Sequence, residues 1–299
     1  MKLLARILPL GEESARTLLS LLPANARGVK SGRYAIDVDD QLFRRILEAG
    51  EIAGGFWVGG EPVWSPAELA GFTHYELASR FVVRESRADF EANDAVRART
   101  PLIDAGGAAP IRLMSGLFLS RVTLKSNMVG SVGDWTEEYV AASGAANTFK
   151  DAGLTGAEFR AVTHPKTGVT HDNCFQLYSE TLLPPVVIDD SVETIVSRHP
   201  EENGRLRHLG CLAYTSAALH ERPDFNRTAE PWGGWHGWPT WVVSARVANT
   251  FKASKLRGWH FRPVLTVDSD VYRNYAACWH TLRDALAATT KSKCDGGRW

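Results

Sequence analysis

The sequence lacks a long apolar run, an excess of charge of one sign and a dense set of cysteines. No stretch approaches the roughly 20 apolar residues that a membrane-spanning helix requires, so membrane insertion is not expected. The 34 basic residues balance the 34 acidic residues, which gives no general electrostatic attraction to nucleic acid or to an anionic membrane. We therefore expect neither nucleic acid nor a membrane as a partner.

The chain also has few cysteines for its 299 residues, and none of them form a CxxC pair. This usage is more typical of free thiols in a reducing compartment than of a disulfide framework. The apolar stretch near the start, Ile7–Leu10, is followed closely by Glu12 and Glu13, and it is too short for the apolar segment of a signal peptide. These features predict a cytoplasmic protein.

What is present is an ordinary globular composition, with 44% hydrophobic and 23% charged residues. A chain of this length can bury a substantial core as one large domain or as two of ordinary size. Helical and strand patterns are mixed along it, which predicts an α+β fold with mixed or antiparallel sheets and flanking helices. The turn-rich stretch Asp104–Pro110 predicts a boundary between an N-terminal region, 1–108, and a C-terminal region, 109–299.

Two helix starts in the N-terminal region carry capping signals. Apolar residues recur at helical spacing over Gln41–Ala49, with Asp40 as the expected cap and Gly50 as the expected stop. Ser65 precedes Pro66 in the order Ser-Pro-x-Glu, which predicts a second helix that begins with a capping box.

Three segments rich in β-branched and aromatic residues predict strands. They are Ile52–Val58, Leu77–Val83 and Ile111–Leu124, and the last of these is either two short strands or one long strand with an irregularity at Gly116.

The C-terminal region contains two copies of one pattern, Ala146–Val162 and Ala248–Val264, whose starts are 102 residues apart. Aligned one residue earlier, AANTFKDAGLTGAEFRAV and VANTFKASKLRGWHFRPV agree at ten of 18 positions, where chance gives about one match. The apolar spacing predicts a helix, and Gly156 or Gly258 permits the turn into a strand. Two copies are too few for a solenoid, so we expect a duplication within an α+β fold.

Two H-x-x-C pairs, His171 with Cys174 and His208 with Cys211, lie between these copies. Together they could provide two imidazoles and two thiolates to a tetrahedral zinc ion, and no other cofactor is predicted. In the alternative interpretation His208 and Cys211 lie on a strand edge and His171 lies in a polar loop.

The segment 224–241 is the most unusual stretch, because it holds four of the ten tryptophans within ten residues. Its glycines and prolines predict a loop, and tryptophan beside arginine and carboxylates has the composition of a binding surface. The alternative is that the rings fold back onto the core. The candidate contact residues are Asp224, Arg227, Glu230, Trp232, Trp235, His236 and Trp238.

Familiar catalytic motifs are missing: G-x-S-x-G, H-E-x-x-H, the P-loop pattern and G-x-G-x-x-G between a strand and a helix. We therefore predict no catalytic residue and favour a protein that is not an enzyme. His220 with Asp224 and His236 with Glu230 could form acid–base pairs, although such pairs are more often structural.

The pattern W-V-V-S at Trp241–Ser244, followed by L-x-G-x-x-F-x-P-V at Leu256–Val264, resembles that of the bacterial immunity proteins called double-CXXCG proteins. These proteins belong to polymorphic-toxin systems, and related immunity families end in a comparable unit. The resemblance covers roughly Gly133–Val267. Where the CXXCG motif would stand, this chain has the sequence of His208–Cys211, so the resemblance does not carry a metal site over.

The resemblance implies a cytoplasmic protein that neutralises a cognate toxin by binding it, without chemistry of its own. The competing hypothesis is an enzyme, or a toxin or effector of unfamiliar type, that uses histidines and acidic residues in a cleft between the two regions. In either case the copies are expected to build the scaffold, and a local function is expected between them, within Thr163–Thr240.

Overall fold

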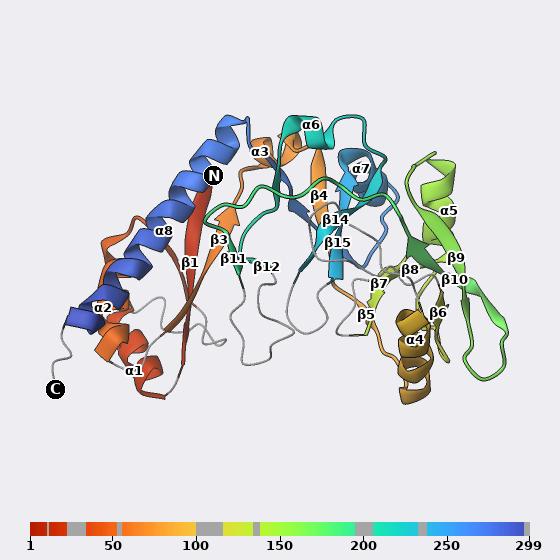
Figure 1. Cartoon of the computed structure of the whole chain (residues 1–299), viewed down its shortest axis with the longest axis horizontal. Helices are drawn as coiled ribbons and strands as arrows, with labels where there is room; N and C mark the ends of the chain where they lie inside the picture. The colour runs from red at the N-terminus through yellow and green to blue at the C-terminus, as the bar shows by residue number, and fades with distance from the viewer. Residues whose placement is uncertain are drawn as a thin grey trace.

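The computed structural model describes most of the chain as helices and strands in mixed and antiparallel sheets, which confirms the α+β fold. Three sheets stand in a row across the molecule, as Figure 1 shows. Among the described residues, no helix combines the length and the apolar composition that crossing a bilayer requires. The described residues are 1–10, 12–22, 34–52, 56–99, 116–133, 138–194, 206–232 and 238–295.

The N-terminal sheet has three antiparallel strands with β1 in the middle. Its strands are β1 (Lys2–Pro9), β2 (Tyr34–Asp37) and β3 (Phe56–Val63). Leu3, Ala5 and Ile7 alternate along β1 and are buried in one core with apolar residues of three helices. Those helices are α1 (Glu12–Leu21), α2 (Gln41–Ile52) and the C-terminal α8 (Asp270–Asp295).

The other two sheets hold the duplicated units, and we call residues 74–163 the first half and residues 170–263 the second half. The first-half sheet has the order β5-β7-β8-β10-β9-β6. Its strands are β5 (Val82–Val83), β6 (Leu117–Phe118), β7 (Val129–Val132), β8 (Tyr139–Ala142), β9 (Glu158–Thr163) and β10 (Thr170–Tyr178).

The second-half sheet has the order β11-β12-β14-β15-β4-β16. Its strands are β4 (His74–Ser79), β11 (Val192–Thr194), β12 (Leu206–His208), β14 (Phe225–Trp232), β15 (Trp238–Ser244) and β16 (Trp259–Pro263). A separate parallel pair joins β13 (Ala213–Tyr214) to β17 (Leu265–Thr266). The remaining helices are α3 (Pro66–Gly71), α4 (Arg87–Arg99), α5 (Ser143–Asp151), α6 (Ser216–Leu219) and α7 (Ala245–Ala253).

The two predicted helix-then-strand units are confirmed, because β8-α5-β9 and β15-α7-β16 occupy the two aligned segments. In each unit, a residue with positive φ, Gly156 or Gly258, lies between the helix and the following strand. Glycine adopts this conformation without the strain that a side chain brings.

One inner strand of each sheet comes from the other half. β10 lies between β8 and β9, antiparallel to both, and β4 lies in the same way between β15 and β16. Leu177 is opposite Phe159, and Leu77 is opposite Phe261. Because Phe159 and Phe261 are equivalent in the repeat, β4 and β10 are equivalent strands offset by 100 residues. The halves therefore exchange their first strands.

Reciprocal backbone hydrogen bonds also join the halves. The N–H of Phe225 in β14 donates to the carbonyl of Thr155 at 3.0 Å, and the N–H of Val129 in β7 donates to the carbonyl of Arg257 at 2.9 Å. Thr155 and Arg257 are equivalent positions in the two units. Such an exchange of equivalent contacts is the property of an interface between two copies related by a twofold axis.

A shared core fills the space between the two halves. Both repeat helices contribute to it, with Ala146 and Phe149 from α5 and Ala248 and Phe251 from α7. Phe149 stacks on Trp259 of the other half, with ring centroids 5.5 Å apart. The repeat residues that the sequence comparison singles out are thus the residues that pack the halves together.

Helix starts were predicted more accurately than helix ends. The Asp40 carboxylate accepts the N–H of Leu42 at 2.8 Å, and α3 begins at Pro66 with the capping box at Ser65. The predicted stop at Gly50 is wrong, because α2 continues to Ile52. The strand expected at 52–58 begins only at residue 56 and runs to residue 63.

The strand predicted over Leu77–Val83 is in fact two strands, because β4 and β5 belong to different sheets. Of the segment Ile111–Leu124, the described part contains only β6, and Asp104–Pro110 lies outside the described residues. The boundary between 1–108 and 109–299 therefore stays a prediction. The pairing of β4 with β15 and β16 crosses it.

Candidate functional site

The described part of the tryptophan-rich segment is mostly strand and not the loop that its composition predicts. β14 and β15 occupy most of it and pair antiparallel, with a register shift between Arg227 and Pro231. Trp241 is fully buried in the core shared by the halves, and Trp232 is 8% exposed. The alternative interpretation, in which rings fold back onto the core, is confirmed for these two residues.

Arg227 is a core residue and not a contact residue. Its side chain is 2% exposed, its guanidinium lies 3.9 Å from the centre of the Trp241 ring, and Nη2 lies 3.5 Å from Oε1 of Glu138. Nη1 also donates to the carbonyl of Pro239 at 3.0 Å. A buried arginine in such a set of partners is an internal ion pair, because leaving either charge alone would be costly.

Asp224 joins the halves from the interior. Its carboxylate accepts from the N–H of Thr155 at 3.0 Å, from Oγ of Ser244 at 2.5 Å and from Nη1 of Arg246 at 2.9 Å. These bonds hold the α5–β9 turn of the first half against the start of α7 in the second half. Asp224 itself is 4% exposed.

Glu230 and Trp232 are likewise engaged inside the fold. Oε1 of Glu230 accepts the N–H of Val186 at 2.7 Å, and Nε1 of Trp232 donates to Oγ1 of Thr228 at 3.1 Å. The predicted contact surface is therefore wrong for Asp224, Arg227, Glu230 and Trp232, because β14 is buried along almost its whole length and Asp224 just before it is buried too. Trp235, His236 and the side chain of Trp238 lie outside the described residues.

The two H-x-x-C pairs are not brought together. Cys174 is buried in the apolar core of the first-half sheet, whereas Cys211 is buried in the core of the N-terminal sheet. Nε2 of His171 lies 2.7 Å from the carbonyl of Leu119. Within the described part of the chain, no three His, Cys, Asp or Glu side chains are grouped as metal ligands. The geometry gives the zinc hypothesis no support.

The cysteines have the properties of buried thiols. Cys174, Cys211 and Cys278 are free, as expected from their sequence spacing. Burial raises the pKa of Cys174 to about 12 and also raises the pKa of Cys211. Because the thiolate is the form that binds metals and attacks electrophiles, both groups are inert as folded.

The suggested pair of His220 and Asp224 does not form. His220 is exposed, and its Nδ1 lies 3.9 Å from Oε1 of Glu221. The carboxylate of Asp224 is instead bonded to Thr155, Ser244 and Arg246. The second suggested pair includes His236, which lies outside the described residues.

A group of charged side chains around a buried glutamate was not predicted from the sequence. Glu76 in the middle of β4 is 2% exposed, and its Oε1 lies 3.4 Å from Nε2 of His208 and 3.2 Å from Nη2 of Arg262. The His208 ring meets the ring of Trp232 edge-on, with centroids 4.9 Å apart. We call Glu76, His208 and Arg262 the Glu76 cluster.

Opposing effects set the pKa values in the Glu76 cluster. Burial lowers the pKa of His208, but the charge of Glu76 and a hydrogen bond with it raise this pKa above 6.5 overall. Burial raises the pKa of Glu76, but the charges of His208 and Arg262 bring it below 4.5. Both shifts favour the charged forms, as an ion pair around the buried carboxylate of Glu76.

The repeat itself contained a signal for the Glu76 cluster. The register equates Glu76 with Gln176, and His74 with Cys174, so the same face is more polar in the second-half sheet than in the first-half sheet. Comparing β4 with β10 requires an offset of 100 residues, whereas the two repeat units are offset by 102 residues. The aligned repeat segments do not include β4 or β10.

Three buried oxygens around the Glu76 cluster lack a hydrogen-bond partner among the described residues: Oε2 of Glu76, Oε2 of Glu230 and the Tyr214 hydroxyl. Burial and the charges of both carboxylates raise the pKa of Tyr214, which places its hydroxyl within their electrostatic reach. Chemically, the group could hold and move protons. None of the described hollows reaches it.

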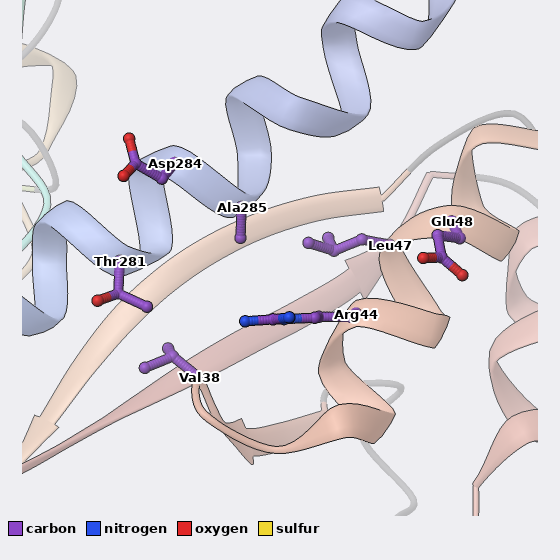
Figure 2. A pocket seen from close by; sticks show the side chains of 7 residues that line it. All are labelled: Val38, Arg44, Leu47, Glu48, Thr281, Asp284 and Ala285. Carbon is purple, nitrogen blue, oxygen red and sulfur yellow. The ribbon is translucent and has the colours of Figure 1, made fainter.

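A hollow of about 410 Å³ lies between α2 and α8 (Figure 2). Val38, Leu47 and Ala285 give it apolar walls, and Arg44 extends between them from α2 towards α8. Its other lining residues, Glu48, Thr281 and Asp284, are polar. Val38 and Leu47 are buried, so this hollow offers little apolar surface to a partner.

A second hollow, of about 700 Å³, lies where β5 leads into α4. Two of its lining residues are exposed large apolar side chains, Val82 at 39% and Phe90 at 46%. Exposed arginines lie beside them at 84 and 87. We call this the β5–α4 hollow, and it is lined by Val82, Arg84, Glu85, Ser86, Arg87, Phe90 and Gly133.

Comparison with known proteins assigns no family to the chain. No protein family model matches it, and no curated protein matches it.

Proposed function

We propose that the chain is a protein-binding module of immunity type, which neutralises a cognate bacterial toxin by binding to it. The β5–α4 hollow carries this proposal, because it presents apolar and cationic side chains to solvent at one place. Aromatic residues and arginine dominate the contacts that hold protein–protein interfaces. The resemblance of Trp241–Ser244 and Leu256–Val264 to immunity proteins supports the same function.

The roles of the interior residues are consistent with this proposal. The residues that carry the resemblance build the shared core and the turn between α7 and β16. These residues form the scaffold. Sequence similarity in them therefore supports a shared fold but does not identify the partner. Affinity then comes from surface residues outside the repeat, such as those of the β5–α4 hollow.

Co-expression with the product of the adjacent gene tests the proposal. We expect that product to stop growth when expressed alone, this chain to restore growth, and the two proteins to co-purify in a fixed ratio. If the product is harmless, or if the chain neither binds it nor restores growth, the proposal fails.

An enzyme or effector is the second candidate, and the unpartnered oxygens around the Glu76 cluster favour it. Such groups could serve as a proton donor and acceptor if the fold opened to substrate. On this hypothesis, expression of the chain alone has a biochemical effect that Glu76→Gln abolishes. On the immunity hypothesis, a folded Glu76→Gln variant still protects against the toxin.

A further inference from the structure

The β5–α4 hollow combines apolar contact area with the positive charge of two exposed arginines, of which Arg87 is paired with Glu91. Arg84 makes no ion pair with another described residue, and the Arg87 side chain is 92% exposed while its Nε donates to Glu91 at 2.9 Å. The other N–H groups of Arg87 remain available, because a guanidinium has five donors. Phe90 and Val82 lie within the same lining. A ligand for this hollow needs both an apolar side chain and a carboxylate.

Among the described lining residues, one side chain is acidic, and its carboxylate is bonded away from the arginines. Oε1 of Glu85 accepts from Nδ2 of Asn93 at 2.6 Å, and Asn93 is 2% exposed. Glu85 is thus directed to the interior of the α4 packing, where burial raises its pKa. The charge that faces a ligand is that of the arginines.

β5 adds a free backbone edge to the hollow. It is the terminal strand of the first-half sheet among the described residues. The carbonyl of Phe81 accepts from the N–H of Ser131 in β7, and the carbonyl of Val83 accepts from the N–H of Gly133 just after β7, both at 3.0 Å. Because peptide groups alternate in direction along a strand, those of Val82 point away from β7. An extended segment can use that edge, as in β-strand addition.

The described part of the second half is built differently at the equivalent place. The counterparts of Val82 and Val83 are Leu182 and Leu183, and the chain after them forms no helix before Val192, with the N–H of Val187 bonded to the carbonyl of Ala213 at 2.8 Å. Val186 there is buried, whereas the first half has α4 at this place. Among the described residues, the arrangement of strand and helix that forms the hollow therefore belongs to the first half.

We propose that the β5–α4 hollow binds an extended acidic segment of a partner protein. A carboxylate of the segment pairs with Arg84 and Arg87, and an adjacent apolar side chain packs on Phe90 and Val82. This inference rests on the proposed function, since the partner is the toxin that the chain neutralises. Charge complementarity selects an acidic segment, and the apolar contact selects a protein over a free anion.

Binding of the adjacent gene's purified product to the full chain tests the inference. We expect Arg84→Glu and Phe90→Ser each to weaken the complex by about tenfold or more, as hot-spot substitutions do. Arg44→Glu, a matched control at the α2–α8 hollow, should change the affinity less than about twofold. Added salt should weaken the wild-type complex more than that of Arg84→Glu.

The outcomes separate the two proposals. If wild-type protein does not bind the product, the immunity function and this inference both fail. If wild-type protein binds and the folded Arg84→Glu and Phe90→Ser variants bind equally well, only the inference fails. Circular dichroism checks folding. If only Arg84→Glu loses affinity, and an acid-to-lysine change in the partner restores it, the pairing is established directly.

Discussion

At the scale of single residues, the charged side chains differ in their exposure to solvent. Glu76 and His208 are buried together, whereas Arg84 and Arg87 stand in solvent beside Phe90. A buried ion pair is weak evidence for stability, but removal of one member leaves a costly unpaired charge. Changes in the Glu76 cluster should therefore alter how the free energy of unfolding depends on pH. Changes in the exposed arginines should alter binding to a partner.

The pH dependence of stability follows from the direction of the shifts. The pKa of folded His208 is above 6.5, so its contribution is fully present below about pH 6.5 and is lost as the pH rises through the folded value. The pKa of folded Glu76 is below 4.5, so its contribution is lost as the pH falls through that folded value. The pair stabilises most in the window between the two.

The variant Glu76→Gln should reverse this dependence above pH 5. Without the carboxylate, burial and the charge of Arg262 lower the pKa of His208, and its hydrogen bond with the carbonyl of Gly210 still raises it. Because burial is the largest of these effects, we expect a folded pKa below 6.5 in this variant.

His74 and His260, whose pKa values burial lowers, add stability that rises with pH in both proteins. The free energy of unfolding should therefore rise with pH in the variant, and more steeply than in wild type, as urea titrations from about pH 5.5 to 8.5 would measure. The exposed control Glu91→Gln should keep the wild-type slope. A falling slope in Glu76→Gln would refute the role assigned to the pair.

At the scale of elements, the helix–turn–strand unit requires its glycine. Gly258 has φ of +112°, and a Cβ there would strike the carbonyl of Val129 in β7. At the equivalent Gly156, with φ of +85°, a Cβ would strike the carbonyl of Phe225 in β14. The glycines are thus retained in both copies because a strand of the opposite half crosses each turn.

Alanine at these positions should destabilise by two separable effects. Gly153→Ala introduces only backbone strain, because its φ is +62° and nothing lies within 4 Å of the added Cβ, which costs about 1 kcal/mol. Gly258→Ala adds the clash and should cost about 2 kcal/mol more. Denaturant unfolding measures both, and equal losses would show that no strand lies against the turn.

The sequence allowed some of these elements to be predicted and not others. Capping residues such as Asp40 and Ser65 identify helix starts because the cap is a local hydrogen bond. The strands β14 and β15 were not predicted, because the glycines and prolines of this segment indicate turns, whereas pairing between the two strands decided the structure. The Glu76 cluster was missed because its members come from β4, β12 and β16, which lie far apart in sequence.

At the scale of the whole molecule, the two halves form one structure by exchanging strands. Neither sheet is complete without a strand of the other half, and the shared core contains equivalent residues from both. The N-terminal sheet and α8 add a third unit (Figure 1). The sequence revealed the duplication, but a repeat in sequence does not specify which copy supplies the inner strand, β4 or β10, of each sheet.

Disulfide trapping tests the exchange most directly. In the exchanged fold, Ala78 of β4 is directly opposite His260 of β16. Without exchange, β4 would take the place of β10, where the equivalent Tyr178 is opposite Glu158 of β9. Directly opposed residues of antiparallel strands lie about 4.5–5.5 Å apart, within disulfide range.

Two double variants, each oxidised in the native state and mapped by peptide mass spectrometry, distinguish the arrangements. The account predicts a cross-link in Ala78→Cys/His260→Cys and none in Ala78→Cys/Glu158→Cys. The opposite result, a link from position 78 to position 158, would contradict the exchange of strands between the two halves.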